Sequence, residues 1–360
     1  MYAQGQDGLM NTYRSAWRTR SPQTYALSAV LIGFYCLLYF TDVLEPIAQA
    51  VQLQNKWYLY GAIYSVFMTA GGVWMLRTHG NNRYHKLRII VNIGIQVALG
   101  FTLPFVMPFF GGKEFYFSYF WPLKYDYLFP DTLWSLPWYL GLYTVLGSLV
   151  LAPVLALFLG KRWYCSWVCG CGALANTFGD PWRHMTPTST ASWRFEKVAI
   201  YTVLALILVL TGIMLIDGFG GKDVGWFHEL AQDSKWVYGF FVGSMLSGVI
   251  GTGVYPILGP RVWCRNFCPM AALLGITQKA GSFRIAVKPD MCISCGNCSA
   301  YCEMGIDVRA YAQQNESFTR ASCVGCGMCA HVCPRGVLKL ENSWDPQTDK
   351  AASGYLTIDF

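Results

Sequence analysis

The chain has little charge and few histidines, and each shortage excludes a kind of protein or site. Only 13% of its 360 residues are charged and 54% are hydrophobic. This composition is typical of a membrane protein. The net charge of +7 needs no nucleic acid to explain it, because a basic membrane face meets anionic lipid.

Histidines are absent from the long apolar stretches. All five fall in predicted loops or in the cysteine-rich C-terminal segment: His79, His85, His184, His228 and His331. A haem b buried in a helical bundle needs axial histidines inside the spans, so we predict no intramembrane bis-histidine haem. The first twenty residues also lack the apolar core and cleavage site of a signal peptide, and none is expected.

Six apolar stretches of bilayer-spanning length predict six transmembrane helices. They run at about residues 25–44, 57–76, 89–110, 138–160, 198–216 and 236–259. Backbone amides must be satisfied internally in hydrocarbon, and the stretches lack the alternating pattern of a β-barrel, so helices are expected. Three prolines are expected to kink them: Pro104, Pro108 and Pro153.

Basic residues predict which ends of the helices face the cytoplasm. Fourteen fall in the tail and loops that share one side: Arg14, Arg18, Arg20, Arg77, Arg83, Lys86, Arg88, Lys161, Arg162, Arg183, Arg194, Lys197, Arg261 and Arg265. The other side has five: Lys56, Lys113, Lys124, Lys222 and Lys235. The positive-inside rule places the first set, both termini and the C-terminal segment in the cytoplasm of a bacterial inner-membrane protein.

Eight of the fourteen cysteines form two copies of one spacing, Cys-x2-Cys-x2-Cys-x3-Cys, and Pro334 follows the second copy. This spacing is typical of a two-cluster bacterial ferredoxin, in which the fourth cysteine of each run ligates the other cluster. One 4Fe-4S cluster is expected on Cys292, Cys295, Cys298 and Cys333, and the other on Cys323, Cys326, Cys329 and Cys302. Zinc is the nearest alternative ligand, and a disulfide framework is a weaker one.

One residue departs from this spacing. Glu303 follows Cys302 where the usual pattern has proline, so the loop after Cys302 is expected to take a different path. Cys36, inside the first span, lies outside every clustered set and is interpreted as a small apolar side chain.

An internal repeat organises the remaining five cysteines. Residues 159–169 and 258–268 share Leu, Gly, Cys and Cys at a constant offset of 99, and Arg162 matches Arg261. Each copy begins where an apolar helix leaves the membrane, so two related halves would bring two Cys-x3-Cys pairs together. We expect each pair on one face of a helical turn, forming a metal site at the membrane surface.

The proposed ligands of this additional site are Cys165, Cys169, Cys264 and Cys268, with Cys171 as a spare ligand or an alternative to Cys169. An iron-sulfur cluster, an iron ion or a copper ion would suit these thiolates. The alternative is that these cysteines only pack helix ends.

Three further patterns are open to more than one interpretation. Asn92 and Gln96 could bond a quinone carbonyl, although polar residues in spans more often join helices. His228 and Glu229 could take quinol protons, although a His-Glu pair in a loop is more often solvated surface. The aromatic segment 115–138 is interpreted first as an interfacial belt, and it could also frame a quinone mouth or a partner's footprint. Along the last span, small residues recur every four positions and predict close approach of the fourth helix: Gly239, Gly243, Ser247 and Gly251.

The two Cys-x3-Cys motifs, at residues 162–169 and 264–269, together with the double cysteine run resemble the membrane polyferredoxins of the NapH, NosR and CcoG type. The resemblance covers the chain from about the third helix to residue 340. It implies a helical membrane domain with a cytoplasmic two-cluster ferredoxin, acting as a quinol dehydrogenase subunit or in maturing copper oxidases. Two departures stand out: Gly170 rather than proline follows Cys169, and no flavin-binding domain precedes the helices.

The predicted fold class is therefore an all-α polytopic membrane domain with six helices and an internal repeat, plus a small α+β ferredoxin domain. The predicted domains are a tail at 1–24, the membrane domain at 25–275, the ferredoxin domain at 276–340 and a tail at 341–360. We expect an iron-sulfur electron-transfer protein of a respiratory chain, with the quinone pool or other redox subunits as partners. A copper-binding maturation factor and a structural or sensory subunit are the alternatives.

Overall fold

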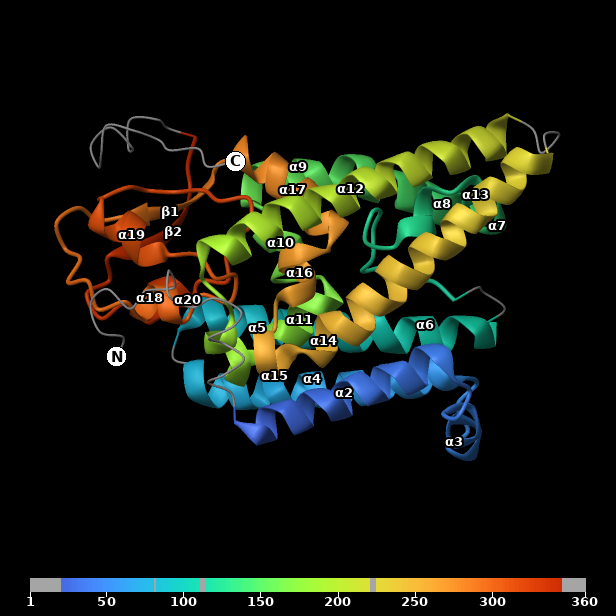
Figure 1. The fold of residues 1–360 in the computed structure, drawn as a ribbon, viewed down its shortest axis with the longest axis horizontal. Helices are drawn as coiled ribbons and strands as arrows, with labels where there is room; N and C mark the ends of the chain where they lie inside the picture. The colour runs from blue at the N-terminus through green and yellow to red at the C-terminus, as the bar shows by residue number, and fades with distance from the viewer. Residues whose placement is uncertain (1–20, 81, 111–113, 221–224, 345–360) are drawn as a thin grey trace.

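A computed structural model describes residues 21–80, 82–110, 114–220 and 225–344 of the chain. Most of the two predicted tails, including Arg14, Arg18 and Arg20, lies outside the described residues, as do Lys113 and Lys222. The described part is a helical bundle with a small mixed domain at one end, which holds α18, α19, α20, β1 and β2 (Figure 1). This arrangement confirms the predicted fold class.

Six helices are long and apolar enough to cross a membrane, as the sequence predicts. The first two are α2 (Pro22–Phe40) and α4 (Lys56–His79), joined by α3 (Glu45–Ala50). The third runs through α5 (Arg83–Ile95), η1 (Gln96–Thr102), α6 (Leu103–Val106) and η2 (Met107–Phe110). The fourth comprises α8 (Trp138–Leu146), η4 (Gly147–Leu151) and α9 (Ala152–Leu159). The fifth is α12 (Thr190–Phe219), and the sixth comprises α13 (Gly225–Tyr238), η6 (Gly239–Ile250) and α14 (Gly251–Gly253).

Widened π-helical turns lie just before two of the predicted kinks. The segment η1 directly precedes the turn that contains Pro104, and η4 precedes the one that contains Pro153. Proline has no N–H and its ring collides with the carbonyl four residues earlier, so the preceding turn loosens. Pro108 lies in the 3-10 turn η2. The longest π-helix, η6, contains no proline and is rich in glycine and serine.

Helices extend further than the apolar stretches suggest, and this corrects the placement of three histidines. His79 is the last residue of α4, His85 lies in the first turn of α5, and His228 lies in α13 rather than in a loop. The polar first half of the last span explains the error, because α13 is helical although its sequence is only weakly apolar. His79 and His85 lie where the bundle meets the small domain, and their rings contact His331.

The two loops that carry the Cys-x3-Cys pairs fold back into the bundle. The first contains α10 (Arg162–Cys165), α11 (Gly170–Asn176) and η5 (Asp180–Met185). The second contains α15 (Tyr255–Leu258), α16 (Val262–Asn266) and α17 (Pro269–Lys279). In Figure 1, α10, α11 and α16 lie between α12 on one side and α4 and α5 on the other. Because α11 packs on α4 and α5, and α16 packs on α12, these loops lie inside the helix bundle.

The aromatic segment between the third and fourth helices also packs inward. It contains η3 (Tyr125–Leu128) and α7 (Pro130–Ser135). Phe115, Phe120 and Phe129 are almost fully buried, and the Tyr164 hydroxyl donates to the Ser118 carbonyl oxygen (2.9 Å). The interpretation as an interfacial belt is therefore wrong for most of this segment, because its rings form core contacts. Only the exposed Trp134 and Trp138 are placed as a belt would require.

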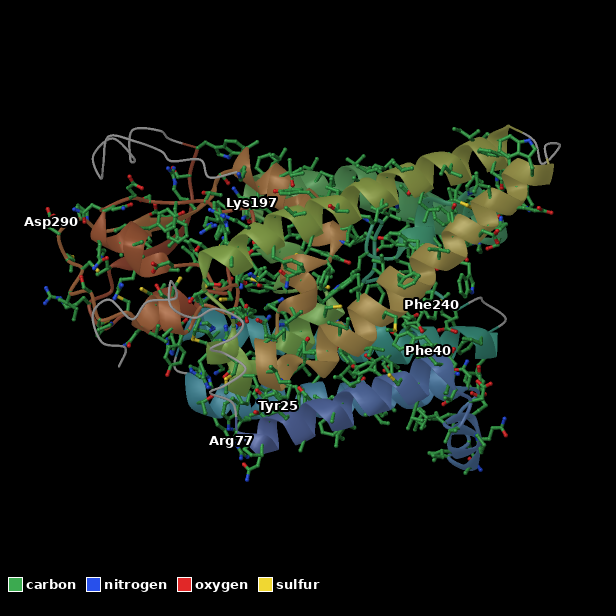
Figure 2. All side chains as sticks on the ribbon, in the orientation of Figure 1. Tyr25, Phe40, Arg77, Lys197, Phe240 and Asp290 are labelled. Carbon is green, nitrogen blue, oxygen red and sulfur yellow. The ribbon has the colours of Figure 1, made fainter. Side chains whose placement is uncertain are left out.

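The small domain at the end of the bundle is built around a two-stranded antiparallel sheet. Strand β1 (Phe283–Val287) pairs with β2 (Leu338–Asn342), with Ile285 opposite Leu340. Three short helices complete it: α18 (Asn297–Ala300), α19 (Val308–Gln313) and α20 (Met328–His331). Figure 2 shows Asp290 at the outer end of this domain, whereas Phe40 and Phe240, whose rings are 5.4 Å apart, lie far along the bundle.

Candidate metal centres and an intramembrane cavity

The backbone of the small domain repeats itself at an offset of 31 residues. Positive φ angles recur at three pairs of positions: Ser294 and Gly325, Gly296 and Gly327, and Gly305 and Gly336. Such angles favour glycine because a side chain collides with the backbone there. Each turn presents the cysteines of one run in the same way, so two equivalent sites result.

Each site is a small cavity lined by four cysteines. The first ferredoxin cavity is lined by Cys292, Cys295, Cys298 and Cys333. The second is lined by Cys302, Cys323, Cys326 and Cys329. These are the two sets that the spacing predicts. Within the described residues, no three His, Cys, Asp or Glu side chains converge where one metal ion would bind. Cysteines that surround a cavity fit a polynuclear cluster, so the residues present suit a cubane, and the ligand assignment stays a prediction.

The loop after Cys302 follows the same path as its counterpart, which corrects the expectation of a different path. Gly305 N–H donates to the Cys302 carbonyl oxygen (3.0 Å), and Gly336 N–H donates to that of Cys333 (3.1 Å). The amide of Ile306 also donates to the Cys302 thiol, as Val337 does to Cys333, both at 3.4 Å. Glycine supplies the positive φ in both turns, so the turn does not depend on proline.

The second ferredoxin cavity lies against the helix bundle. Tyr84 donates to the Gly325 carbonyl oxygen (2.7 Å) and Ser166 donates to that of Val324 (2.7 Å). Arg88 donates to the carbonyl oxygen of Cys326 (2.5 Å). These bonds fix the loop that carries Cys323 and Cys326 to the membrane domain.

The two Cys-x3-Cys copies have equivalent conformations. Gly160 and Gly259 have φ of 71° and 86° at the helix ends, and each is followed by one short helix. Cys169 N–H donates to the Tyr164 carbonyl oxygen (2.8 Å), and Cys268 N–H donates to that of Trp263 (3.0 Å). Cys169 and Cys268 cap the next helices, α11 and α17. Each pair therefore spans a break between two helices, which corrects the expectation of one helical turn.

Four of these cysteines form one buried group. Cys165, Cys169, Cys264 and Cys268 are 4–6% exposed and share one hydrophobic cluster. The thiol of Cys268 is near enough to the other three for their charges to interact. This buried cysteine group lies inside the bundle, which corrects the expectation of a site at the membrane surface. A set of four thiols suits an iron-sulfur cluster, whereas no three of these described thiols converge where a single metal ion would bind.

Cys171 points elsewhere. Its thiol neighbours Cys169 but lines a large cavity of about 490 Å³, the tyrosine cavity. Eight tyrosines contribute to its walls: Tyr35, Tyr39, Tyr58, Tyr60, Tyr64, Tyr116, Tyr119 and Tyr255. The cavity also contacts Trp263, the residue before Cys264. Its volume lies within the range of small-molecule binding sites.

Asn92 and Gln96 mainly hold the first re-entrant loop. The Asn92 amide donates to the Ser166 carbonyl oxygen (3.1 Å), and the Gln96 amide donates to that of Val168 (2.5 Å). Gln96 also lines the tyrosine cavity, where its oxygen accepts from the Tyr64 hydroxyl (3.4 Å). His228 instead bonds Asp217 at 2.9 Å. Gln96 and the aromatic segment, both considered above as quinone contacts, lie in the wall of the tyrosine cavity. The cavity as a whole could not be located from the sequence, because its walls come from six separate segments of the chain.

Comparisons with known proteins point to the same cysteine segments. Residues 285–340 match the family model of a 4Fe-4S dicluster domain. Residues 142–185 and 241–288 match that of a 4Fe-4S binding domain, and they include the buried cysteine group. No solved structure matches the chain.

Three curated relatives are ferredoxin-type or electron transport proteins. The putative electron transport protein YccM of Escherichia coli is 25% identical over 171 residues, which are 44% of this chain and 46% of YccM. The methylamine utilization ferredoxin-type protein MauN of Paracoccus denitrificans is 26% identical, over 46% of this chain and 56% of MauN. The ferredoxin-type protein NapH of Escherichia coli is 26% identical, over 44% of this chain and 53% of NapH.

The chain is similar to the NapH-like membrane polyferredoxins over its cysteine-bearing segments. It spans about half the length of the curated relatives that it matches. The family model of a 4Fe-4S binding domain matches two stretches of this chain, each of which contains one re-entrant loop. This agrees with the internal repeat, because each stretch contributes one Cys-x3-Cys pair.

Proposed function

We propose that this protein transfers electrons between a quinone and its two ferredoxin clusters by way of a cluster on the buried cysteine group. The observation that carries the proposal is the order in which the cavity and the cysteine sites lie in the molecule. The tyrosine cavity contacts Cys171 and Trp263, the buried cysteine group follows, and the second ferredoxin cavity lies against the bundle. The first ferredoxin cavity lies beyond it, toward a possible protein partner such as another redox subunit.

The ligands proposed for the clusters are those predicted from the sequence. Cys292, Cys295, Cys298 and Cys333 would hold the outer cluster, and Cys323, Cys326, Cys329 and Cys302 the inner one. Cys165, Cys169, Cys264 and Cys268 would hold the third, and the family model of a 4Fe-4S binding domain over both loops favours iron-sulfur over copper. A cubane supplies one-electron transfer when it is bound.

The tyrosine cavity would take the quinone headgroup. Its volume suits an aromatic ring with part of an isoprenoid chain. Tyrosine hydroxyls at the wall can donate hydrogen bonds to a quinone carbonyl oxygen, and the Gln96 side-chain oxygen can accept one from a quinol hydroxyl. Gly100 and Gly170 keep the wall near Gln96 open, because neither carries a side chain there.

The two-electron reaction of a quinone can be completed by two one-electron transfers from a cluster. A quinone takes two electrons and two protons to become a quinol, so two successive transfers from the buried centre complete one reduction, and the reverse order oxidises a quinol. Near the outer-loop end of the cavity, the Tyr116 hydroxyl donates to the Glu114 carboxylate, and this pair can exchange protons with solvent. We place both termini and the ferredoxin domain in the cytoplasm because the basic residues gather at that end.

A cavity-filling variant tests the proposal. Protein purified anaerobically and reduced with dithionite is mixed with a short-chain quinone, and cluster oxidation is followed by freeze-quench EPR. In the Gly100→Phe variant the ring occupies the cavity, so we expect cluster spectra to persist while oxidation by quinone slows at least tenfold.

The matched control is Gly94→Phe, on the same span, where nothing lies within 4 Å of the added carbon. It should react like the parent protein. Full-rate oxidation in Gly100→Phe would contradict the quinone site, and absence of iron from the parent protein would contradict the whole proposal.

A further inference from the structure

Glu303 occupies the position after the fourth cysteine of its run, where the second run has Pro334. The backbone turn is the same in both runs, so Glu303 is not needed to shape the loop. Its side chain is fully buried between the small domain and the bundle. A buried carboxylate is costly unless it is paired, so its partners indicate what it does.

Two arginines from different parts of the chain pair with this carboxylate. One oxygen of Glu303 lies 2.9 Å from a terminal nitrogen of Arg183 in η5. The other accepts from Arg261, before α16, at 3.0 Å. Both guanidinium groups are at most 3% exposed. Two ion pairs, at 2.9 and 3.0 Å, compensate this buried carboxylate in its charged form.

Each arginine also reaches a thiol of a different cysteine site. Arg183 donates to the sulfur of Cys326, in the second ferredoxin cavity, at 3.8 Å. Arg261 donates to the sulfur of Cys264, in the buried cysteine group, at 3.7 Å. Cys326, Arg183, Glu303, Arg261 and Cys264 thus form one continuous chain of polar contacts between the two sites.

Charge beside a cluster controls its reduction potential. A guanidinium that donates to a ligand sulfur stabilises the more negative, reduced form and raises the potential. A carboxylate paired with that guanidinium offsets part of its charge and lowers the potential again. Because Glu303 is shared by both arginines, its charge acts on both sites at once.

We propose that Glu303 is a shared charge that sets the reduction potentials of the inner ferredoxin cluster and of the buried centre together. This inference rests on the proposed function, since it requires clusters at both sites. The two sites would remain close in potential, which favours reversible electron transfer between them. Glu303 is a positioning residue in this scheme, because it acts through the arginines.

The contacts also predict which site responds more. Arg183 is paired with a second carboxylate, that of Asp180, at 2.8 Å. Arg261 otherwise donates to neutral oxygens, those of the Asn176 side chain (2.9 Å) and the Cys165 backbone (3.2 Å). Loss of the Glu303 charge leaves the positive charge of Arg261 less compensated than that of Arg183. The midpoint potential of the buried centre should therefore rise more than that of the inner cluster.

The test is an EPR-monitored redox titration of the full-length protein in nanodiscs, with dithionite and mediators and without quinone. In Glu303→Gln we expect both midpoint potentials to rise. The midpoint potential of the buried centre should rise by at least about 59 mV, which corresponds to a tenfold change in the reduction equilibrium of a one-electron couple. The outer cluster, on the far side of the small domain, should not change. Glu341→Gln, which alters an exposed carboxylate paired with Lys339, is the control and should leave all potentials unchanged.

If Glu303→Gln changes the midpoint potential of only one of the two sites, or of neither, the proposal is overturned and Glu303 is a packing residue. If Glu303→Gln does not load clusters, Arg183→Lys carries the test, because it keeps the charge but shortens the reach to Cys326. It should then lower the potential of the inner cluster, because the contact with Cys326 is lost, and also lower that of the buried centre, because Glu303 then compensates Arg261 more fully. A change at the inner cluster alone, or unchanged potentials at both sites, would overturn the proposal. Absence of any cluster signal in the parent protein would instead refute the proposed function.

Discussion

Five of the basic residues that the sequence assigns to one membrane face are buried: Arg88, Lys161, Arg183, Arg261 and Arg265. The expectation that basic residues in loops face anionic lipid is wrong for these five. Four of them lie near the cysteine sites, whereas Arg265 pairs with Glu196. Sequence spacing cannot reveal this burial, because it depends on the fold of the re-entrant loops. Only Glu303, at a position usually held by proline, gave a signal.

The buried Arg265–Glu196 pair provides a residue-scale prediction of stability. Arg265 donates to the Glu196 carboxylate at 2.7 Å, and both side chains are less than 10% exposed. Arg265→Met leaves an unpaired buried carboxylate, which we expect to cost about 3 to 5 kcal/mol, measured by thermal unfolding in detergent. The double variant Arg265→Met with Glu196→Leu should recover most of this loss.

The exposed Lys339–Glu341 pair is the comparison, since its loss in Lys339→Met should cost less than about 1 kcal/mol. Equal destabilisation by both single variants would show that the burial of Arg265 does not matter.

Elements differ in how far the sequence predicts them. Six spans follow from local composition, and the structure confirms their number. The sequence also predicts the two repeated loops, but not that they fold back, because this depends on contacts with distant helices. The partner that the sequence predicts for the small-residue stripe in the last span is also wrong. A Cβ at Gly239 would meet the Tyr125 hydroxyl and one at Gly251 would meet Trp263, so the stripe serves loops and not the fourth helix.

The contact of Gly251 with Trp263 leads to a prediction at the element scale. A Cβ at Gly251 would lie 2.9 Å from that of Trp263, the residue before Cys264. Gly251→Leu should therefore displace α16 and reduce iron at the buried cysteine group, while the ferredoxin EPR signals persist. Gly94→Leu is the control and should keep all the iron. Full iron content in Gly251→Leu, measured per chain, would contradict the contact.

Gly160 tests how the small domain is attached. Its φ of 71° and ψ of 170° suit only glycine, and an added Cβ would lie 2.6 Å from Phe283 in β1. Gly160→Ala should cost about 1 to 3 kcal/mol or more and increase hydrogen exchange in β1 and β2. Exchange unchanged from the parent would show that this turn does not hold the sheet in place.

For the whole molecule, the sequence predicts the components, but the structure is needed for their order. Cysteine spacing suffices to sort eight cysteines into two sets, because each run is local. The sequence raises Gln96 and the aromatic segment as possible quinone contacts, but it could not locate the tyrosine cavity. The third and sixth spans, α2, α4, the aromatic segment and the re-entrant loops all contribute to its walls. The tyrosine cavity lies among the helices of the bundle, whereas the first ferredoxin cavity lies in the small domain, whose outer end is marked by Asp290 (Figure 2).

The orientation of the whole protein in the membrane is a further prediction. The small domain is expected in the cytoplasm, so a reporter phosphatase that folds only in an oxidising compartment should be inactive when fused after Asn342. The same reporter fused after Gln54, between α3 and α4, should be active. The reverse pattern would contradict the orientation and the proposed path of electrons to the cytoplasm.

The central claim is that a cluster on the buried cysteine group carries electrons between the tyrosine cavity and the ferredoxin domain. The most direct measurement compares the parent protein with a Cys165→Ser, Cys264→Ser variant, both purified anaerobically, for iron per chain and for oxidation of the reduced ferredoxin clusters by quinone. We predict about twelve iron atoms in the parent and about eight in the variant, because each cubane holds four. The variant should keep both ferredoxin signals but lose their oxidation by quinone. Equal iron content and equal rates in the two proteins would contradict the account.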